Sequence, residues 1–355
     1  MELLNRKKTG KVERPVKVLQ FGEGNFLRAF VDYMIDIANE QGKFNGDIVL
    51  VKPIEFGSLD RFHDQECQYT VQLRGIVDGE PKRINRIVTS VADAVDAYGE
   101  YQKYADYAKL DSLRYIVSNT TEAGIVYDDT DRLEMEPPKS YPGKLTKFLY
   151  ERYKHFNGAM DKGLVMLPVE LIDDNGIHLK ECVEKLAVLW NLEDGFKTWL
   201  DEACVFTSTL VDRIVTGYPR DEAEELCKEF GYQDNLIVTG EPFALWVIES
   251  AKDISKEFPL PDAGLPVIFT DNQKPYKQRK VRILNGAHTS FVLASYLCGN
   301  DIVLESMQDE LIFNFMKATI FDEVIPTLTL PKQDLIDFAE AVITRFNNPY
   351  VKHAL

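Results

Sequence analysis

A strand, a glycine turn and a helix follow one another near the start of the chain, and this succession constrains the fold more than any other feature. Residues 16–20, VKVLQ, predict a short buried strand, and the apolar residues of 26–37 recur with helical spacing. Between them, Gly22 and Gly24 give a tight turn. This order is the context of a dinucleotide phosphate site, in which the backbone approaches a pyrophosphate at a helix N-terminus. The candidate cofactor-binding residues of this segment are Gly22, Gly24, Asn25, Phe26 and Arg28.

The glycine motif departs from its full form, GxGxxG, because its third glycine is replaced by Leu27. A plain helix-capping turn is therefore an alternative, and Arg28 could be a surface cation instead of a phosphate partner. Residues 47–51, DIVLV, predict the second strand, after which an acidic residue would favour NAD. Glu55 could bind the ribose hydroxyls, whereas Lys52 could tolerate a 2′-phosphate. We expect NAD as the cofactor.

Strand and helix patterns alternate as far as about residue 271, which predicts a mostly parallel, Rossmann-type α/β domain over residues 1–271. Residues 114–118, RYIVS, predict a buried strand that runs into the polar segment SNTTEAGI of 118–125. Ligands bind at the carboxyl ends of strands in such sheets. Ser118, Asn119 and Thr120 are therefore further candidate cofactor-binding residues, with a polar surface loop as an equal alternative.

The pattern changes after Asp271, because residues 280–297, 301–321 and 331–347 all show helical periodicity. We predict a helical substrate and catalytic domain over residues 272–355. The chain then stops at PYVKHAL without a helix stop signal, and three helices make a thin domain. We expect this domain to be incomplete, as in a C-terminally truncated form.

The stretch KVRILNGAH, at the predicted entrance of the helical domain, carries the candidate catalytic residues Lys280, Asn285 and His288. On a helix all three can line one broad face that is otherwise apolar. A lysine held against an apolar surface has a lowered pKa and can serve as a general acid or base. Asn285 and His288 could then hold a carbonyl or hydroxyl oxygen beside it. The alternative is a solvated lysine and a structural histidine.

Charge and cysteine content restrict the partners of the chain. The net charge of −16 argues against nucleic acid and anionic membrane surfaces. No apolar run approaches a membrane span of about 20 residues, and the N-terminus lacks the pattern of a signal peptide. Five cysteines without a CxxC pair predict reduced thiols in the cytoplasm, and five scattered histidines suggest no metal site. We expect a small-molecule enzyme that is a monomer or a small homo-oligomer.

Several segments together resemble the long-chain polyol dehydrogenase family, also called the mannitol dehydrogenase family. Its nucleotide motif G-x-G-x-F-x-R-A matches residues 22–29, and its catalytic pattern K-x4-N-x2-H matches residues 280–288. VDRI at 211–214 and EPFALWVIE at 241–249 also look like family segments. The resemblance implies a metal-independent, NAD-linked oxidoreductase with a Rossmann-type domain and a helical C-terminal domain like that of 6-phosphogluconate dehydrogenases. It also implies that Lys280 is the general acid and base.

Within the family, the chain is most similar to a branch that reduces a keto-uronate to an aldonate in hexuronate catabolism. Two departures from the sugar-alcohol members fit such a substrate. Leu171 stands where they often have an oxygen-binding Asn, and Lys277 stands where they can have a Glu. Lys277 or Arg279 could pair with the substrate carboxylate, the alternative being that both point to solvent.

Asp212, in the VDRI segment, completes the candidate substrate residues Lys277, Arg279 and Asp212. We expect Asp212 and Arg213 to form a structural charge pair, because an acid and a base inside an apolar run usually need each other. Two alternatives to the uronate activity stay open. One is another polyol or uronate dehydrogenase of the family, and the other is a non-catalytic NAD-binding module.

Overall fold

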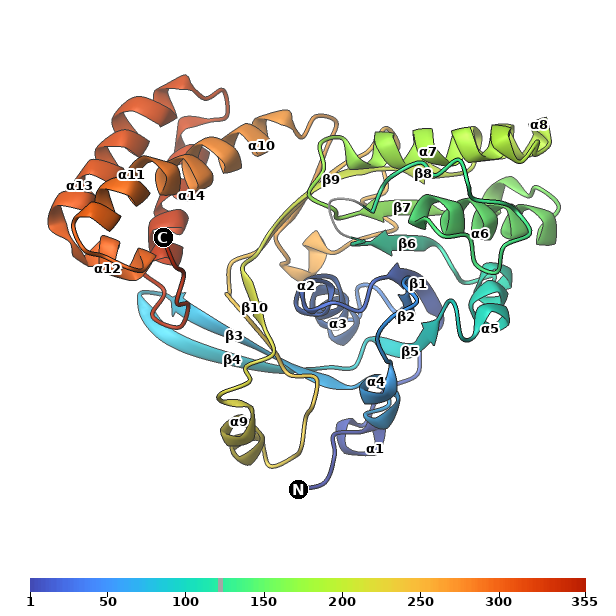
Figure 1. Cartoon of the computed structure of the whole chain (residues 1–355), viewed down its shortest axis with the longest axis horizontal. Helices are drawn as coiled ribbons and strands as arrows, with labels where there is room; N and C mark the ends of the chain where they lie inside the picture. The colour runs from blue at the N-terminus through green and yellow to red at the C-terminus, as the bar shows by residue number, and fades with distance from the viewer. Residues whose placement is uncertain (121–123) are drawn as a thin grey trace.

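The computed structural model describes residues 1–120 and 124–355, so part of the predicted SNTTEAGI segment lies outside the described residues. Its centre is a six-stranded sheet in the order β5-β2-β1-β6-β7-β8, in which every neighbouring pair is parallel (Figure 1). The strands are β1 (Val16–Phe21), β2 (Asp47–Lys52), β5 (Val91–Asp96), β6 (Tyr115–Ser118), β7 (Val165–Pro168) and β8 (Val205–Phe206). Strand order reverses between β1 and β6, which makes this the switch point of the sheet. The predicted Rossmann-type architecture is confirmed.

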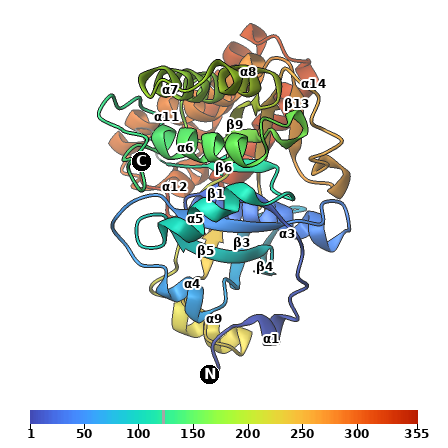
Figure 2. The same ribbon diagram turned by 90° about the vertical axis from the view of Figure 1, so that its right-hand side faces the viewer.

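Helices cover both faces of this sheet, as Figure 2 shows from the side. One face carries α2 (Asn25–Leu27), a π-helical turn (Arg28–Asp32) and α3 (Tyr33–Glu40). The other carries α5 (Tyr101–Asp106), α6 (Tyr141–His155), α7 (Asn175–Leu189) and α8 (Asp194–Glu202). Val18 of β1 packs toward α3, whereas Leu19 and Phe21 pack toward α6 and α8. This alternation is the period-two pattern of a strand buried on both faces.

Two smaller sheets extend the domain. The first has the order β10-β11-β3-β4, and the second has the order β13-β12-β9. Their strands are β3 (Tyr69–Val77), β4 (Glu80–Val88), β9 (Ser208–Asp212), β10 (Val215–Gly217), β11 (Val238–Gly240), β12 (Leu245–Glu249) and β13 (Val267–Thr270). β3 and β4 form an antiparallel hairpin, and its turn residues Asp78 and Gly79 both have positive φ, as a tight hairpin turn requires. β8 and β9 follow one another closely in the chain but belong to different sheets.

The helical unit comprises α10 (Lys274–Arg279), a π-helical segment (Lys280–Asn285), α11 (Gly286–Leu297), α12 (Val303–Gln308), α13 (Glu310–Ala318), a second π-helical segment (Thr319–Val324) and α14 (Lys332–Phe346). It packs on β12, where Leu245 and Val247 meet Ile283 and Phe291. The first helix begins at Lys274, six residues before the predicted start, with Pro275 in its first turn. Lys280 therefore lies inside a helix and not at its entrance.

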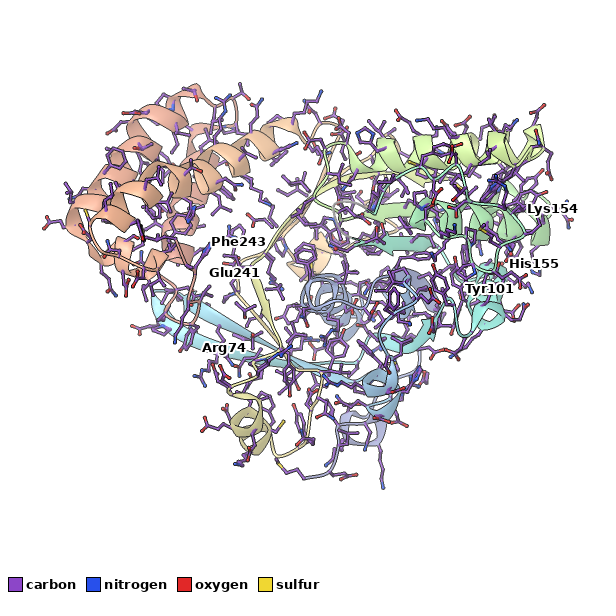
Figure 3. All side chains as sticks on the ribbon, in the orientation of Figure 1. Arg74, Tyr101, Lys154, His155, Glu241 and Phe243 are labelled. Carbon is purple, nitrogen blue, oxygen red and sulfur yellow. The ribbon has the colours of Figure 1, made fainter. Side chains whose placement is uncertain are left out.

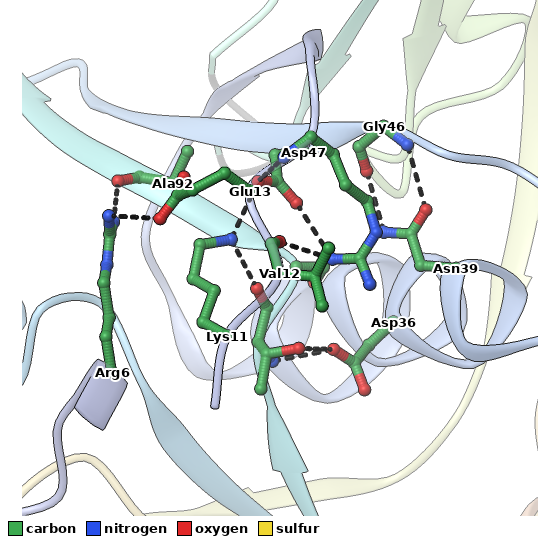
Figure 4. A network of polar contacts seen from close by, with 12 residues as sticks. Arg6, Lys11, Val12, Glu13, Asp36, Asn39, Gly46, Asp47 and Ala92 are labelled. Atoms are coloured by element: carbon green, nitrogen blue, oxygen red, sulfur yellow. Dashed lines mark hydrogen bonds and ion pairs between the residues drawn. The ribbon is translucent and has the colours of Figure 1, made fainter. Parts of the chain in front are cut away.

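Buried polar contacts tie the peripheral segments to the sheet. The carboxylate of Asp47, at the start of β2, accepts a hydrogen bond from Lys11 Nζ at 2.7 Å, and this anchors the N-terminal segment near α1 (Arg6–Thr9) (Figure 4). At the other end of the chain, Asn348 Nδ2 donates to the Arg74 carbonyl of β3 at 2.9 Å. The short helices α4 (Asp60–Asp64) and α9 (Ala223–Phe230) lie below the hairpin in Figure 1. Within the described residues, no helix is long and apolar enough to cross a membrane.

Candidate active site

A cavity of about 440 Å³ opens at the switch point of the sheet. Residues that follow β1, β2 and β6 line it, among them Gly22, Gly24, Pro53, Asn119 and Thr120. In open α/β sheets this is the position at which a dinucleotide binds. The predicted strand–turn–helix thus contributes directly to a ligand-sized hollow, together with two of the three candidates after β6.

The two glycines of the turn serve different purposes. Gly22 has φ +119°, and a Cβ there would lie 3.1 Å from the Asn119 carbonyl oxygen and 3.1 Å from Leu27 Cδ1. A side chain would therefore be strained by the backbone conformation and would crowd the Asn119 carbonyl and Leu27. At Gly24 a Cβ would meet nothing within 4 Å, so the backbone faces the open cavity. The backbone of Gly22 and Gly24 thus forms a cradle without side chains at a helix N-terminus, which fits a pyrophosphate. Leu27, at the position of the third glycine, packs in the core beside Gly22.

Arg28 is turned away from the cavity, which corrects its assignment as a direct phosphate partner. The residue is 6 % exposed, and its guanidinium donates to the Leu236 carbonyl and to Asn25 Oδ1, each at 2.5 Å. The same group lies over the ring of Tyr69. Arg28 therefore fixes Asn25 at the first position of the helix, where the cradle ends. Phe26 stacks on Phe30, with ring centroids 5.0 Å apart, and packs against the hydrophobic core.

The ammonium of Lys52 is already bound by an aspartate and by backbone carbonyls of this chain, so it is not free to bind a 2′-phosphate. Its side chain is 2 % exposed, and Nζ lies 3.0 Å from the Asp96 carboxylate. The same ammonium donates to the carbonyls of Glu55 at 3.2 Å and Gly57 at 3.1 Å. Lys52 thus shapes the loop after β2, from which Pro53 and Ile54 line the cavity. The Glu55 side chain is exposed and is not among the lining residues, so its contact with the ribose stays a prediction.

Glu170 joins this cavity to a second one, and it was not among the candidates drawn from the sequence. Its carboxylate accepts hydrogen bonds from Ser118 Oγ at 3.1 Å and from the Thr120 amide and hydroxyl at 3.0 and 2.9 Å. Burial raises the pKa of Glu170. The available sequence indication was an acid placed directly after the buried strand at 163–169, at the same sheet edge as Thr120. Ser118 is accordingly a buried support for Glu170.

The second cavity, of about 300 Å³, lies where the sheet domain meets the helical unit. Glu170 and Leu171 line it from one side, and Lys277, Lys280 and Asn285 line it from the other. Lys280 Nζ donates to the Val211 carbonyl of β9 at 2.9 Å. Burial lowers the pKa of Lys280, and the neighbouring Asp212 charge opposes this only in part. An ammonium with a lowered pKa beside a cavity is suited to proton transfer.

The π-helical segment explains why Lys280 and Asn285 face the same space. Its backbone bonds join residues five apart, so residue 285 lies one turn beyond residue 280. His288 lies outside this lining. Its ring is stacked on His353 with centroids 5.4 Å apart, and Phe291 lies against its edge. The common face expected from regular helical geometry thus holds for the lysine and the amide, whereas the placement of the histidine differs.

His288 nevertheless carries an unpaired polar atom. Its Nε2 is buried and has no hydrogen-bond partner among the described residues. Burial lowers the pKa of His288, and the neighbouring His353 lowers it further. Both effects favour the neutral form of the imidazole, and its role toward a substrate oxygen stays a prediction.

Asp212 is paired with Arg345 of α14 and not with its neighbour Arg213, which corrects the predicted charge couple. Arg345 donates to both Asp212 oxygens, at 3.0 and 2.8 Å, and to both Glu241 oxygens, at 2.9 and 2.8 Å. The Phe243 ring lies 4.2 Å from the guanidinium carbon, and Figure 3 places Glu241 and Phe243 at the junction with the helical unit. Since this buried cluster occupies both Asp212 oxygens, Asp212 is not free to bind a substrate.

Arg213 and Arg279 are also structural. Arg213 donates to the carbonyls of Ala29 at 2.6 Å and Phe243 at 3.0 Å. These hydrogen bonds connect the helix after the glycine turn with the segment before β12. Arg279 lies over the Phe338 ring at 4.5 Å, is 8 % exposed and does not line the cavity. Neither the substrate role nor the solvent position considered for Arg279 therefore holds. Lys277, in contrast, lines the cavity and forms an ion pair with Asp173.

Family models and curated relatives match nearly the whole chain. The model of the mannitol dehydrogenase Rossmann domain matches residues 16–261, and that of the mannitol dehydrogenase C-terminal domain matches residues 272–355. An altronate oxidoreductase of Bacteroides thetaiotaomicron is 45% identical over 355 residues, which is 100% of this chain and 74% of the relative. An altronate oxidoreductase of Pectobacterium atrosepticum is 47% identical over 356 residues, covering 100% of this chain and 73% of the relative.

Solved structures show the same fold at lower identity. The Pseudomonas fluorescens mannitol 2-dehydrogenase, in a ternary complex with NAD and D-mannitol, gives a TM-score of 0.78 at 23% identity, with 100% of this chain and 75% of that chain covered. A D-sorbitol dehydrogenase in substrate-free form gives a TM-score of 0.83 at 22% identity, with 99% and 76% covered. Both similarities concern the sheet and the helical unit together.

Proposed function

Because this chain belongs to the mannitol dehydrogenase family, we propose that it is an NAD-dependent oxidoreductase that interconverts D-tagaturonate and D-altronate. The placement of Lys280 carries the proposal. Its ammonium lies at a cavity that is joined through Glu170 to the glycine cradle at the switch point. Relatives that are 45–47% identical and named altronate oxidoreductases support the choice of substrate.

Several residues that line the two cavities have a part in this reaction. NAD, when bound, supplies or accepts the hydride. Gly22 and Gly24 hold its pyrophosphate, and Asn119 and Thr120 line the same space. Lys280 donates a proton to the keto oxygen of tagaturonate, and its amine accepts that proton in the reverse reaction. Asn285 orients this oxygen, and His288 is assigned the same task as a neutral hydrogen-bonding group.

Lys277 is the proposed partner of the substrate carboxylate. It lines the cavity one helical turn before Lys280, and its side chain is 35% exposed, so that a small anion can reach it. Leu171 stands on the opposite side of the same cavity. We propose that the reaction takes place in the cytoplasm, and the five free cysteines support a reducing compartment.

The direct test is the oxidation of NADH, followed by its absorbance, with tagaturonate, fructuronate and fructose side by side. We expect turnover of tagaturonate at a kcat/KM well above that of the other two. Turnover of fructuronate or fructose in its place would assign the chain to another activity of the family. NADH binding without turnover of any of the three would favour a non-catalytic module.

The buried Lys52 predicts a clear preference for NAD over NADP. A 2′-phosphate near the end of β2 would find this ammonium already neutralised by Asp96 at 3.0 Å. We expect kcat/KM with NADH to exceed that with NADPH by about tenfold or more, which corresponds to about 1.4 kcal/mol. Initial rates at equal cofactor concentrations measure this ratio. Equal rates would mean that a cation other than Lys52 serves the 2′-position.

A further inference from the structure

Three lysines line the catalytic cavity at a regular spacing. Lys274, Lys277 and Lys280 follow one another at intervals of three residues along α10 and into its π-helical continuation. With a rise of about 1.5 Å per residue, Lys277 and Lys274 lie about 4.5 and 9 Å along the helix from Lys280. Lys280 is half-buried, whereas Lys274 is exposed. The proposed general acid is therefore the inner end of a row of cations that leads outward.

A carboxylate of the protein itself already occupies the middle cation of this row. Asp173, in the segment that follows β7, forms its ion pair with Lys277 across the cavity. The Asp173 side chain is 78% exposed, so the pair stands in water at the rim. Ion pairs with this exposure are weak, and a second carboxylate can displace one partner readily.

The spacing of the row suits a particular class of substrate. In a 2-keto-hexuronate, four carbon–carbon bonds separate the carbonyl carbon from the carboxylate carbon. Bonds of about 1.5 Å in an extended chain place these two carbons about 5 Å apart. Lys280 and Lys277 line the same cavity one helical turn apart, so a substrate of this length can place its carbonyl oxygen near the first and its carboxylate near the second. Lys277 is the lysine of this pair that Asp173 already neutralises.

We propose that Asp173 is an internal stand-in for the substrate carboxylate, which a 2-keto-hexuronate displaces from Lys277 and a neutral ketose does not. This inference rests on the proposed function and deepens it, because it assigns selectivity between charged and neutral substrates to one ion pair. A uronate replaces the broken pair with an equivalent one. A neutral ketose of the same length leaves Lys277 without compensation, or leaves Asp173 in its way.

The test is a double-mutant cycle in the full chain, with tagaturonate and NADH as substrates. Asp173→Asn should lower KM for tagaturonate about two- to fivefold, because the competing charge is removed. Lys277→Met should raise KM about tenfold or more. The effects should fall on KM and not on kcat, and Asp173→Asn should have no further effect once Lys277 is Met. Lys332→Met, an exposed lysine at the start of α14, is the matched control and should behave as the wild type.

The outcomes separate the inference from the proposed function. Wild-type turnover of tagaturonate, with an Asp173→Asn variant whose KM is unchanged or raised, would overturn the inference alone. The same holds if Asp173→Asn still lowers KM in the Lys277→Met background. Turnover of fructose without turnover of any uronate would overturn the proposed function, and absence of all turnover would overturn both. Because Asp173 is exposed, thermal midpoints of the variants should match the wild type and exclude misfolding as the cause.

Discussion

Replacement of Lys280 by alanine should lower kcat for tagaturonate reduction by about 100- to 10 000-fold, the range expected for loss of a general acid. The variant should still bind NADH, because the glycine cradle at Gly22 and Gly24 belongs to the other cavity. Steady-state kinetics measure the loss, and the change in NADH fluorescence on binding measures the retained affinity. The two readouts together separate proton transfer from cofactor binding.

The pH dependence of the wild type gives a second view of the same residue. Reduction requires the ammonium of Lys280, so its rate should fall as pH rises through the lowered pKa of this group. Oxidation of altronate requires the amine, so its rate should rise over the same interval. Both pH dependences should vanish in Lys280→Ala, whereas Lys317→Ala, which removes an exposed lysine of α13 that does not line the cavity, should keep them. If Lys280→Ala retained most of its kcat, another group would have to be the proton donor.

Local features of the sequence predicted the parts of the site that one segment forms by itself. The Gly22 and Gly24 cradle follows from glycine's backbone freedom, and it needs only β1 and the helix after it. Lys280 and Asn285 lie close in sequence and share a helix, so their common cavity could be anticipated as well. The π-helical turn between them could not, because a change from i→i+4 to i→i+5 bonding leaves no mark in the apolar periodicity.

Features that depend on distant segments could not be predicted in the same way. The neighbouring charges of Asp212 and Arg213 indicated a pair, yet β9 ends at Asp212, and Arg213 donates instead to the carbonyls of Ala29 and Phe243. Asp212 then finds Arg345, which lies 133 residues further along the chain. Arg28 carried a motif position typical of phosphate contact, but the Leu236 carbonyl, brought by another segment, accepts its hydrogen bond. Tertiary packing therefore determines which group each buried charged side chain pairs with.

The cluster around Arg345 leads to the largest expected effect on stability. Arg345→Met should lower the free energy of unfolding by about 3–5 kcal/mol, because it leaves Asp212 and Glu241 buried without their shared cation. Arg345 is 7 % exposed, and Asp212 and Glu241 are 6 % and 1 % exposed, so water cannot replace the lost partner. Denaturant unfolding at neutral pH measures the loss. Arg282→Met, which removes an exposed arginine of the same unit, should change stability little.

The loss in Arg345→Met should also depend on pH, with a sign that identifies its cause. Burial raises the pKa of Glu241 even beside Arg345, and loss of the cation should raise it further above the value in the unfolded chain. A carboxyl whose folded pKa is raised destabilises the fold as pH increases above its unfolded pKa. The variant should therefore recover stability on acidification from pH ~8 toward ~5, and Glu241→Gln in the same chain should abolish most of that slope. A loss independent of pH would instead point to the packing of Arg345 on Phe243.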